Sequence, residues 1–296
     1  MPKTNRSRRS WLGFSIAAAV GGFPGYWQSF ADDITIESAS DSGDLLPIAA
    51  FLGLNAVDKD VRRQALYLIE RNFRVDDVGM LLESIRMNRH LPTQDLIFEL
   101  LARNTNGPST RDLSTWYRWL WNQNVKLHPQ YADFKSRLYD TIDPRFAEYF
   151  DPNRETMIRL DEIRWGGVVR DGIPPLDHPE LISAPEATYL DDTNVVFGVF
   201  VNGVARAYPK RILAWHEMVR DNVGGREING VYCTLCGSMI VYDPIYDGVH
   251  HRLGTSGFLY RSNKLMYDAV TKSMWSTLKG KPVMGPLVGK GIKLGT

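Results

Sequence analysis

Apolar side chains recur at helical spacing through the first half of the chain, from about residue 45 to residue 150. One segment begins at Asp60 and places Ala65 and Ile69 on a common face, and a second spans residues 93–104. Side chains three and four positions apart share a helix face, so both segments are predicted to form amphipathic helices. The second segment partly repeats the first, which resembles HEAT-type stacked helices, and two such units indicate a compact domain rather than a long solenoid.

In the second half of the chain, glycine and proline become frequent, and short β-rich runs replace the helical spacing. Residues 195–201 and 204–208 flank Asn202-Gly203, a dipeptide typical of two-residue hairpin turns, so they predict a β-hairpin. Pro209 can begin a short helix directly after this hairpin. Further short β-rich runs follow toward the end of the sequence.

These patterns predict an α+β protein with two folded parts. A helical (HEAT-like) N-terminal domain covers residues 45–155, and a β-rich CxxC domain covers residues 156–296. We expect the β-rich domain to be a partly closed sheet or barrel with a few short helices. Residues 32–44 are polar and rich in Asp and Ser, and they predict a linker ahead of the helical domain.

The first 31 residues have the composition of a targeting segment. They carry four basic side chains and no acidic one, followed by a mildly apolar stretch and small residues up to Ala31. This order is typical of a secretory signal peptide, and the pair Arg8-Arg9 indicates the twin-arginine type, which exports folded proteins. The alternative is a disordered basic tail or an uncleaved anchor. We expect residues 1–31 to direct the protein to the periplasm and to be removed there.

Composition narrows the classes of function. Hydrophobic residues make up 44% of the chain and charged residues 23%, as in globular proteins. No apolar run reaches the roughly 18 residues of a membrane span, so none is expected after signal cleavage. The formal net charge of +1 gives no general electrostatic reason to bind nucleic acid. With two cysteines, the chain cannot form a disulfide-stapled scaffold or a four-cysteine metal site of its own.

The candidate chemistry lies in the CxxC motif Cys233-Thr234-Leu235-Cys236-Gly237, inside a predicted strand–turn–strand segment. The spacing lets both sulfurs face one point, and Gly237 can adopt the positive φ that such a turn requires. Three interpretations remain open: a structural disulfide, a redox-active dithiol with one lowered thiol pKa, and half of a thiolate metal site. A thioredoxin is disfavoured, because a strand-like run rather than a helix follows the motif.

A metal site would need one or two ligands besides Cys233 and Cys236. His216 is the first candidate, and His250 and His251 are further ones. Thiolate and imidazole ligands favour copper or zinc over magnesium or calcium. A four-thiolate site shared by two such turns in a homodimer also remains open. A cysteine nucleophile beside His216 would suit a hydrolase, but the sequence offers no identifiable oxyanion hole.

A second group of polar residues follows the cysteines. Arg261, Asn263 and Asp268 alternate with aromatic and apolar residues in a segment that predicts two strands joined by a turn. One interpretation is local turn chemistry, in which Asn and Asp side chains bond the nearby backbone. The other interpretation is a polar lining that binds substrate beside the cysteines.

Five stretches occur in this order along the second half of the chain: residues 171–176, 202–209, 212–217, 232–238 and 256–268. Together they resemble a family of bacterial proteins, often exported, known as a domain of unknown function. The usual cysteine motif of that family reads YCPLCGT, and here Thr234 replaces its proline and Ser238 its threonine. Family members usually continue beyond residues 285–287, so the resemblance implies that this chain ends short of the usual length.

We therefore expect an exported protein with a thiolate metal or redox site and an oxidoreductase-type function. The predicted catalytic residues, which are also the predicted metal ligands, are Cys233, Cys236 and His216. The predicted substrate-binding residues are Arg261, Asn263 and Asp268. The alternative is a non-catalytic periplasmic binding or scaffold module in which the cysteines form a structural disulfide. The sequence does not identify the partner, whether a small molecule or a protein.

Overall fold

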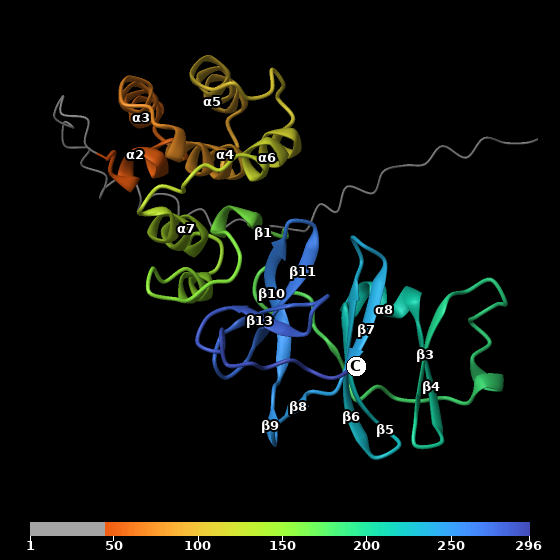
Figure 1. Cartoon of the computed structure of the whole chain (residues 1–296). Coiled ribbons are helices and arrows are strands. Elements are labelled where there is room, and N and C mark those ends of the chain that lie inside the picture. The colour runs from red at the N-terminus through yellow and green to blue at the C-terminus, as the bar shows by residue number, and fades with distance from the viewer. Residues whose placement is uncertain (1–44) are drawn as a thin grey trace, which may run out of the picture.

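The computed structural model describes residues 45–296, and the predicted signal peptide (1–31) and linker (32–44) lie outside the described residues. Helices occupy the first part of the described chain and strands the second, as the α+β prediction requires (Figure 1). Within the described part, no helix combines the length and apolar character needed to cross a membrane. The α-helices are α2 (Ile48–Gly53), α3 (Lys59–Arg71), α4 (Val78–Met87), α5 (Leu91–Asn104), α6 (Leu113–Asn122), α7 (Tyr131–Asp140) and α8 (Lys210–His216).

The two helices expected from apolar spacing are α3 and α5. The Asp58 side chain accepts hydrogen bonds at the start of α3, and the helix buries Ala65 and Ile69. Helix α5 begins two residues before the predicted start, because proline fits its first turn and the His90 side chain caps the N–H of Thr93. The likeness to HEAT repeats and the domain boundary at residue 155 stay predictions.

The strands form two larger sheets and two hairpins. A five-stranded sheet has the order β1-β10-β11-β12-β13, a four-stranded sheet has the order β2-β5-β6-β7, and β3-β4 and β8-β9 pair separately. The strands are β1 (Ile163–Trp165), β2 (Leu176–Asp177), β3 (Val196–Val201), β4 (Val204–Pro209), β5 (Met218–Val223), β6 (Arg226–Cys233), β7 (Ser238–Tyr242), β8 (Ile245–Tyr246), β9 (Val249–His250), β10 (Leu253–Tyr260), β11 (Asn263–Asp268), β12 (Met274–Ser276) and β13 (Lys281–Met284).

The expected closure into a partial barrel is wrong, because both larger sheets are open. Closure requires the first and last strands of a sheet to pair, whereas β1 and β13 stand at opposite edges of the five-stranded sheet. Successive tight hairpins join β10 to β13, and these produce a meander with short outer strands. The predicted hairpin at Asn202-Gly203 is present as β3-β4.

The four-stranded sheet has a covered face on each side. On one face, Val231 of β6 packs with Met266 and Trp275 of the five-stranded sheet. On the other face, Ile228 and Tyr232 of the same strand pack against the side that carries β3, β4 and α8. We call the first contact region, between the two larger sheets, the inter-sheet seam (Met218, Val231, Tyr242, Leu253, Met266, Trp275 and Leu294).

The helical part is joined to the five-stranded sheet by a shared core. Phe146 and Phe258 meet edge to face, with ring centroids 4.7 Å apart. Lys135 of α7 is fully buried, and its ammonium group donates to Glu83 Oε1 at 2.8 Å and to the carbonyl of Leu160 at 3.0 Å. These contacts fix the strand segments against the helices instead of leaving a flexible joint between them.

Candidate functional site

The CxxC motif forms the tight turn between β6 and β7. Cys233 ends β6 and pairs with Ser238 at the start of β7, so four residues make the turn. Gly237 has φ +63°, the left-handed conformation expected for this position. Both cysteines are free thiols, but Cys233 is buried and Cys236 is exposed. The turn therefore presents one sulfur to solvent and keeps the other in the protein interior.

Cys236 lies among hydrogen-bond donors. The side-chain amide of Asn263 donates to Cys236 Sγ at 3.0 Å, and the Ser238 hydroxyl donates to it at 3.7 Å. Partial burial acts to raise the pKa of Cys236, but hydrogen bonds from Cys233, Ser238 and Asn263 outweigh it and lower the pKa. Cys236 is therefore the more readily ionised thiol of the pair.

The environment of Cys233 acts in the opposite direction. Burial raises the pKa of Cys233, and its hydrogen bond to Cys236 raises it further, because the bond holds the proton on the Cys233 sulfur. Backbone N–H groups of Lys264 and Cys236 partly oppose this effect. The pair thus consists of an exposed thiol that ionises early and a buried thiol that keeps its proton.

A buried ion pair lies beside Cys233. Lys264 of β11 is 4% exposed, and its Nζ lies 3.1 Å from Glu217 Oε2, in contact distance but without hydrogen-bond geometry. Burial lowers the pKa of Lys264, whereas the charges of Glu217 and Cys233 act to raise it. The buried ammonium group therefore has hydrogens left to stabilise an additional negative charge close to the cysteines.

Glu217 reaches this position through an unusual backbone conformation. It follows the last residue of α8 with φ +54° and ψ −3°, in the left-handed region that non-glycine residues rarely adopt. This conformation turns the chain from α8 into β5 while Glu217 Oε1 accepts a hydrogen bond from the Thr234 hydroxyl at 2.8 Å. The carboxylate thus links Lys264 to the CxxC turn.

His216 is adjacent in sequence but makes a different contact. Its Nδ1 lies 3.0 Å from the carbonyl oxygen of Pro174, which can only accept, so Nδ1 carries the proton and donates. His216 lies beside the site because it directly precedes Glu217 in the chain. The hydrogen bond of His216 goes to the backbone rather than to a cysteine sulfur. His250 and His251 pair instead with Glu227 and Asp268.

Of the three predicted substrate-binding residues, Asn263 lies against Cys236. Arg261 occupies the β10–β11 turn and forms an ion pair with Glu162 at 2.5 Å. Asp268 is buried at the other end of β11, roughly 17 Å from Asn263 at about 3.3 Å per residue, where it binds His251. Turn chemistry explains Asp268, which also accepts the N–H of Thr271 at 2.7 Å.

A pocket of about 420 Å³ opens next to the β10–β11 turn. Three arginines line it, namely Arg118, Arg164 and Arg261, together with Trp121 and Ser262. The residue after Ser262 is Asn263, which contacts Cys236. Consecutive residues of this hairpin therefore line the arginine-rich pocket and contact the exposed thiol.

Sequence reasoning missed the ion pair of Lys264 with Glu217. One signal was present, because Lys264 directly precedes the run Leu265-Met266-Tyr267, and another was that Glu217 directly follows the candidate His216. Neither signal identifies the partner, since α8 and β11 meet only in the folded chain. Among residues 45–296, no group of three or more His, Cys, Asp or Glu side chains is arranged to hold a metal ion.

Comparison with known proteins finds a family model that matches the region containing this site. Residues 170–294 match the family described as "Protein of unknown function (DUF3179)", which supports the resemblance found in the sequence. The match covers β2 to β13 and leaves out the helical part. No curated protein and no solved structure matches the chain.

Proposed function

We propose that the chain is an exported oxidoreductase that exchanges disulfides through Cys233 and Cys236. The observation that supports this most is the difference between the two sulfurs, one exposed with a lowered pKa and one buried with a raised pKa. Thiol–disulfide exchange needs an accessible thiolate to attack and a second thiol to complete the reaction. A purely structural disulfide needs neither property.

In the first step, the Cys236 thiolate attacks one sulfur of a partner disulfide. The partner S–S bond breaks, a mixed disulfide with Cys236 forms, and the other partner sulfur leaves as a thiolate. Asn263 and Ser238 donate to Cys236 Sγ and stabilise the attacking thiolate. The exposed position of Cys236 allows a large partner to reach the sulfur.

In the second step, Cys233 gives its proton to the partner thiolate released in the first step and attacks Cys236 Sγ. The mixed disulfide breaks, the Cys233–Cys236 disulfide forms, and the second partner sulfur is released as a thiolate. Two electrons pass from the cysteine pair to the partner, and the reverse sequence oxidises a partner dithiol. Lys264 assists by stabilising the Cys233 thiolate, since charge on Cys233 already acts on the Lys264 pKa.

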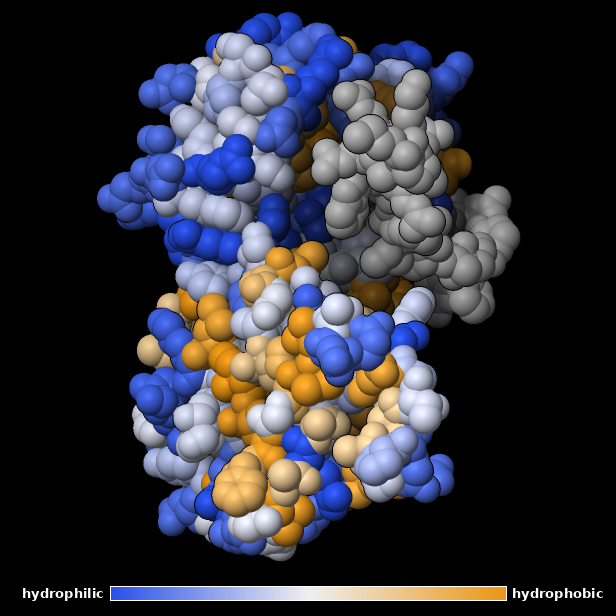
Figure 2. Space-filling model, turned by 90° about the vertical axis from the view of Figure 1, so that its right-hand side faces the viewer, coloured by the Kyte–Doolittle hydropathy of each residue, from blue (hydrophilic) through white to orange (hydrophobic). Residues whose placement is uncertain are grey.

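The partner we propose is a protein that carries acidic groups near its disulfide. Arg118, Arg164 and Arg261 would attract carboxylates to the pocket beside Asn263. Leu235, at the tip of the CxxC turn, is exposed, and exposed apolar residues favour contact with another protein. Figure 2 shows apolar residues gathered over the β-rich half on the β3–β4 side, where Phe200 is 73% exposed.

The twin-arginine signal predicted for residues 1–31 would deliver a folded protein to the periplasm, an oxidising compartment in which disulfide chemistry is common. The same two sulfurs also support a second candidate, a copper or zinc site completed by His216 or by a second copy of the turn. The third candidate is a binding or scaffold module with a structural disulfide. Only the exchange mechanism predicts a mixed disulfide with Cys236, so detecting this species distinguishes it from the other two candidates.

The test is to trap the mixed disulfide. The reduced chain is mixed with 5,5′-dithiobis(2-nitrobenzoate), an acidic aromatic disulfide, and its release of thiol and its mass are followed. We expect the wild type to release two thiols and end as an internal disulfide. Cys233→Ser should release one thiol and keep the adduct on Cys236, and Cys236→Ser should react slowly.

Two controls make the result specific. Arg118→Gln lies at the exposed rim of the pocket and should slow the acidic probe without slowing the neutral 2,2′-dithiodipyridine. Elemental mass spectrometry on the same sample measures copper and zinc. Equal, slow reaction of both cysteine variants, or a stoichiometric metal lost on Cys233→Ser, would reject the exchange mechanism.

A further inference from the structure

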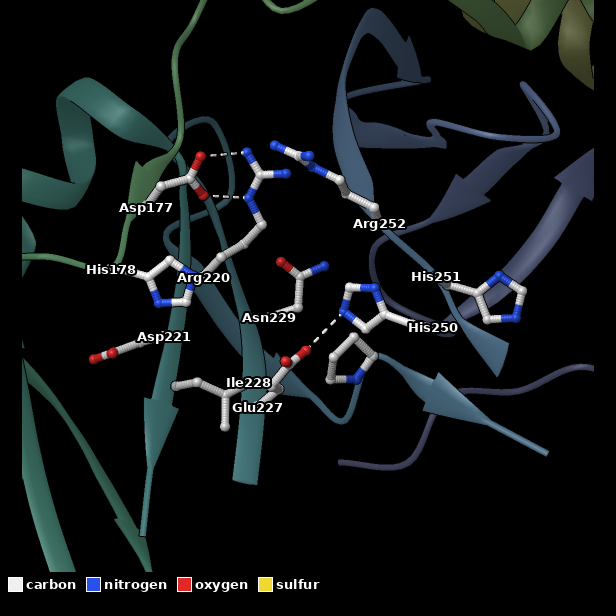
Figure 3. Close-up of a pocket in the computed structure, with 11 residues that line it drawn as sticks. Asp177, His178, Arg220, Asp221, Glu227, Ile228, Asn229, His250, His251 and Arg252 are labelled. Carbon is white, nitrogen blue, oxygen red and sulfur yellow. Dashed lines mark hydrogen bonds and ion pairs between the residues drawn. The ribbon is translucent and has the colours of Figure 1, made fainter. Parts of the chain in front are cut away.

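A second pocket, of about 260 Å³, lies at the end of the inter-sheet seam that is opposite to the CxxC turn. Its walls come from β2, β5 and β6 of the four-stranded sheet and from the segment that joins β9 to β10 (Figure 3). Asn229 lies on the same strand as Cys233 and on the same face, roughly 13 Å away at about 3.3 Å per residue. Val231 fills the seam between them, so this pocket is separate from the dithiol.

The wall of this pocket contains an unsatisfied amide. Asn229 is 1% exposed, yet neither its Oδ1 nor its Nδ2 has a hydrogen-bond partner among the described residues. Leaving a buried polar group without a partner costs free energy, and native proteins rarely keep one without a reason. In Figure 3 the Asn229 amide lies between Arg220 and His250. The amide is therefore available to a bound molecule.

Most charges around the pocket are already paired. Arg220 holds Asp177 with two contacts, Nε to Oδ1 at 2.5 Å and Nη2 to Oδ2 at 2.8 Å. His250 Nε2 lies 2.9 Å from Glu227 Oε2. These contacts bind the carboxylates of Asp177 and Glu227 to side chains of the protein.

Asp221, the third acid of the lining, is also occupied. Its Oδ2 accepts from the Tyr208 hydroxyl at 2.8 Å and lies 3.8 Å from Arg206 Nε. Its Oδ1 accepts the backbone N–H of Asn222 at 2.7 Å. The acids of the pocket are thus bound to the protein itself rather than offered to a ligand.

Arg252 is the cation that remains. Within the described part of the chain, its guanidinium group has no ion pair or hydrogen bond, although it lines the pocket. Figure 3 shows the guanidinium ends of Arg252 and Arg220 pointing toward one another above Asn229. Asp177 balances the charge of Arg220, so Arg252 carries the charge that an added anion would neutralise. An oxyanion in this space could accept hydrogen bonds from both guanidinium groups.

We propose that this pocket binds a small monocarboxylic acid that carries a hydrogen-bonding substituent. Arg252 and the remaining N–H groups of Arg220 would hold the carboxylate in the planar geometry that guanidinium groups favour. The Asn229 amide, which can both donate and accept, would bind the substituent. The pocket volume limits the ligand to a compact molecule.

Charge distinguishes a carboxylate from a phosphate. Arg252 supplies one uncompensated positive charge, because the charge of Arg220 is already balanced by Asp177. A phosphate dianion would bring a second negative charge close to Asp177 and Glu227 with nothing to neutralise it. A cationic ligand would meet Arg252 directly. A monoanion is therefore the ligand that fits the charges present.

The test uses isothermal titration calorimetry of the full chain with four probes: acetate, glycolate, inorganic phosphate and methylammonium. Glycolate should bind more tightly than acetate, since its hydroxyl group can bond to Asn229, and phosphate and methylammonium should bind more weakly. Arg252→Gln should weaken glycolate by about tenfold or more. Arg226→Gln, an exposed arginine on the same strand paired with Asp243 outside the pocket, should leave binding unchanged.

Asn229→Leu separates a binding role from a structural one. It removes an unpaired buried amide, so the melting temperature should hold or rise while the advantage of glycolate over acetate disappears. The proposal is overturned if no probe binds at millimolar concentration, or if Arg252→Gln binds like the wild type. It is also overturned if phosphate binds most tightly, or if Asn229→Leu keeps the preference for glycolate.

Discussion

Asn263 and Ser238 each donate a hydrogen bond to Cys236 Sγ, the sulfur that attacks in the proposed mechanism. A thiolate accepts such bonds more strongly than a thiol, so the donors favour ionisation. Cys233, at the start of the same turn, is buried, and this burial raises its pKa so that it keeps its proton. The two identical side chains therefore differ in reactivity because of the groups around them.

The first prediction concerns the pH dependence of Cys236. Alkylation by iodoacetamide requires the thiolate, so its rate should rise with pH and reach half its maximum below the pH of an ordinary thiol. Asn263→Ala removes one donor, which should raise the pKa of Cys236 and slow alkylation at pH 7 by about threefold to tenfold. Mass spectrometry over a pH series measures both effects.

The control for this prediction is Asn153→Ala, at an exposed position remote from the cysteines. Its alkylation profile should match the wild type. If Asn263→Ala also matches the wild type, the hydrogen bond to Cys236 does not set the reactivity of that thiol. Faster labelling of Cys233 than of Cys236 would contradict the assignment of the attacking sulfur.

The second prediction concerns the ion pair of Glu217 with Lys264. Glu217→Gln leaves the buried ammonium group without its counter-charge, which should lower the free energy of unfolding by about 3 kcal/mol. Glu70→Gln is the matched control, because Glu70 pairs with Arg103 at the surface and such pairs contribute about 1 kcal/mol or less. Urea unfolding compares them, and equal losses would show that the buried pair has no special role.

Sequence reasoning could identify the cysteines, and the CxxC spacing places their sulfurs on one turn. It also singled out Asn263 as a substrate-binding residue, which stays a prediction, and the structure places the Asn263 amide against Cys236. It could not find the pair of Lys264 with Glu217, because the contact joins segments with no local signal linking them. It grouped Asp268 with Asn263 although the two stand at opposite ends of β11.

At the scale of elements, local sequence patterns were enough to predict the β3–β4 hairpin but not the arrangement of strands in the two larger sheets. The turn at Asn202-Gly203 depends on two adjacent residues, and the hairpin forms as predicted. The division into two sheets depends on β1 pairing with β10, a contact between distant segments. Such pairings leave no periodic trace in the sequence, so an open pair of sheets was mistaken for a partial barrel.

The third prediction concerns the irregular position in β10, where the pairing register with β11 shifts. Gly257 has φ +88°, and a Cβ there would lie 2.7 Å from the carbonyl oxygen of Val168 and 2.8 Å from the Phe146 ring. Gly257→Ala should therefore lower the free energy of unfolding by about 3 kcal/mol, from backbone strain and overpacking together.

Gly203→Ala provides the matched comparison. Gly203 has φ +82°, but a Cβ there would meet nothing within 4 Å, so only backbone strain of about 1 kcal/mol is expected. Denaturant unfolding of the two variants measures the difference. A loss at Gly257 no larger than at Gly203 would mean that the contact between β10 and the helical part is not tightly packed.

At the scale of the whole molecule, the inter-sheet seam separates two sites. The dithiol lies at one end, where Cys233 of β6 is close to Lys264 of β11. The carboxylate pocket lies at the other end, around Asn229 and Arg252. The helical part packs against the five-stranded sheet and so supports the hairpin that carries Asn263 and lines the arginine-rich pocket.

The redox equilibrium of Cys233 and Cys236 tests the central claim most directly. The folded chain is equilibrated with defined ratios of reduced to oxidised glutathione, quenched with acid, alkylated and weighed by mass spectrometry. The account predicts one two-electron transition between dithiol and internal disulfide, with a potential less negative than about −270 mV and an unchanged fold in both states. A disulfide with a reduction potential more negative than about −300 mV would contradict this claim, as would a metal that prevents oxidation of the thiols.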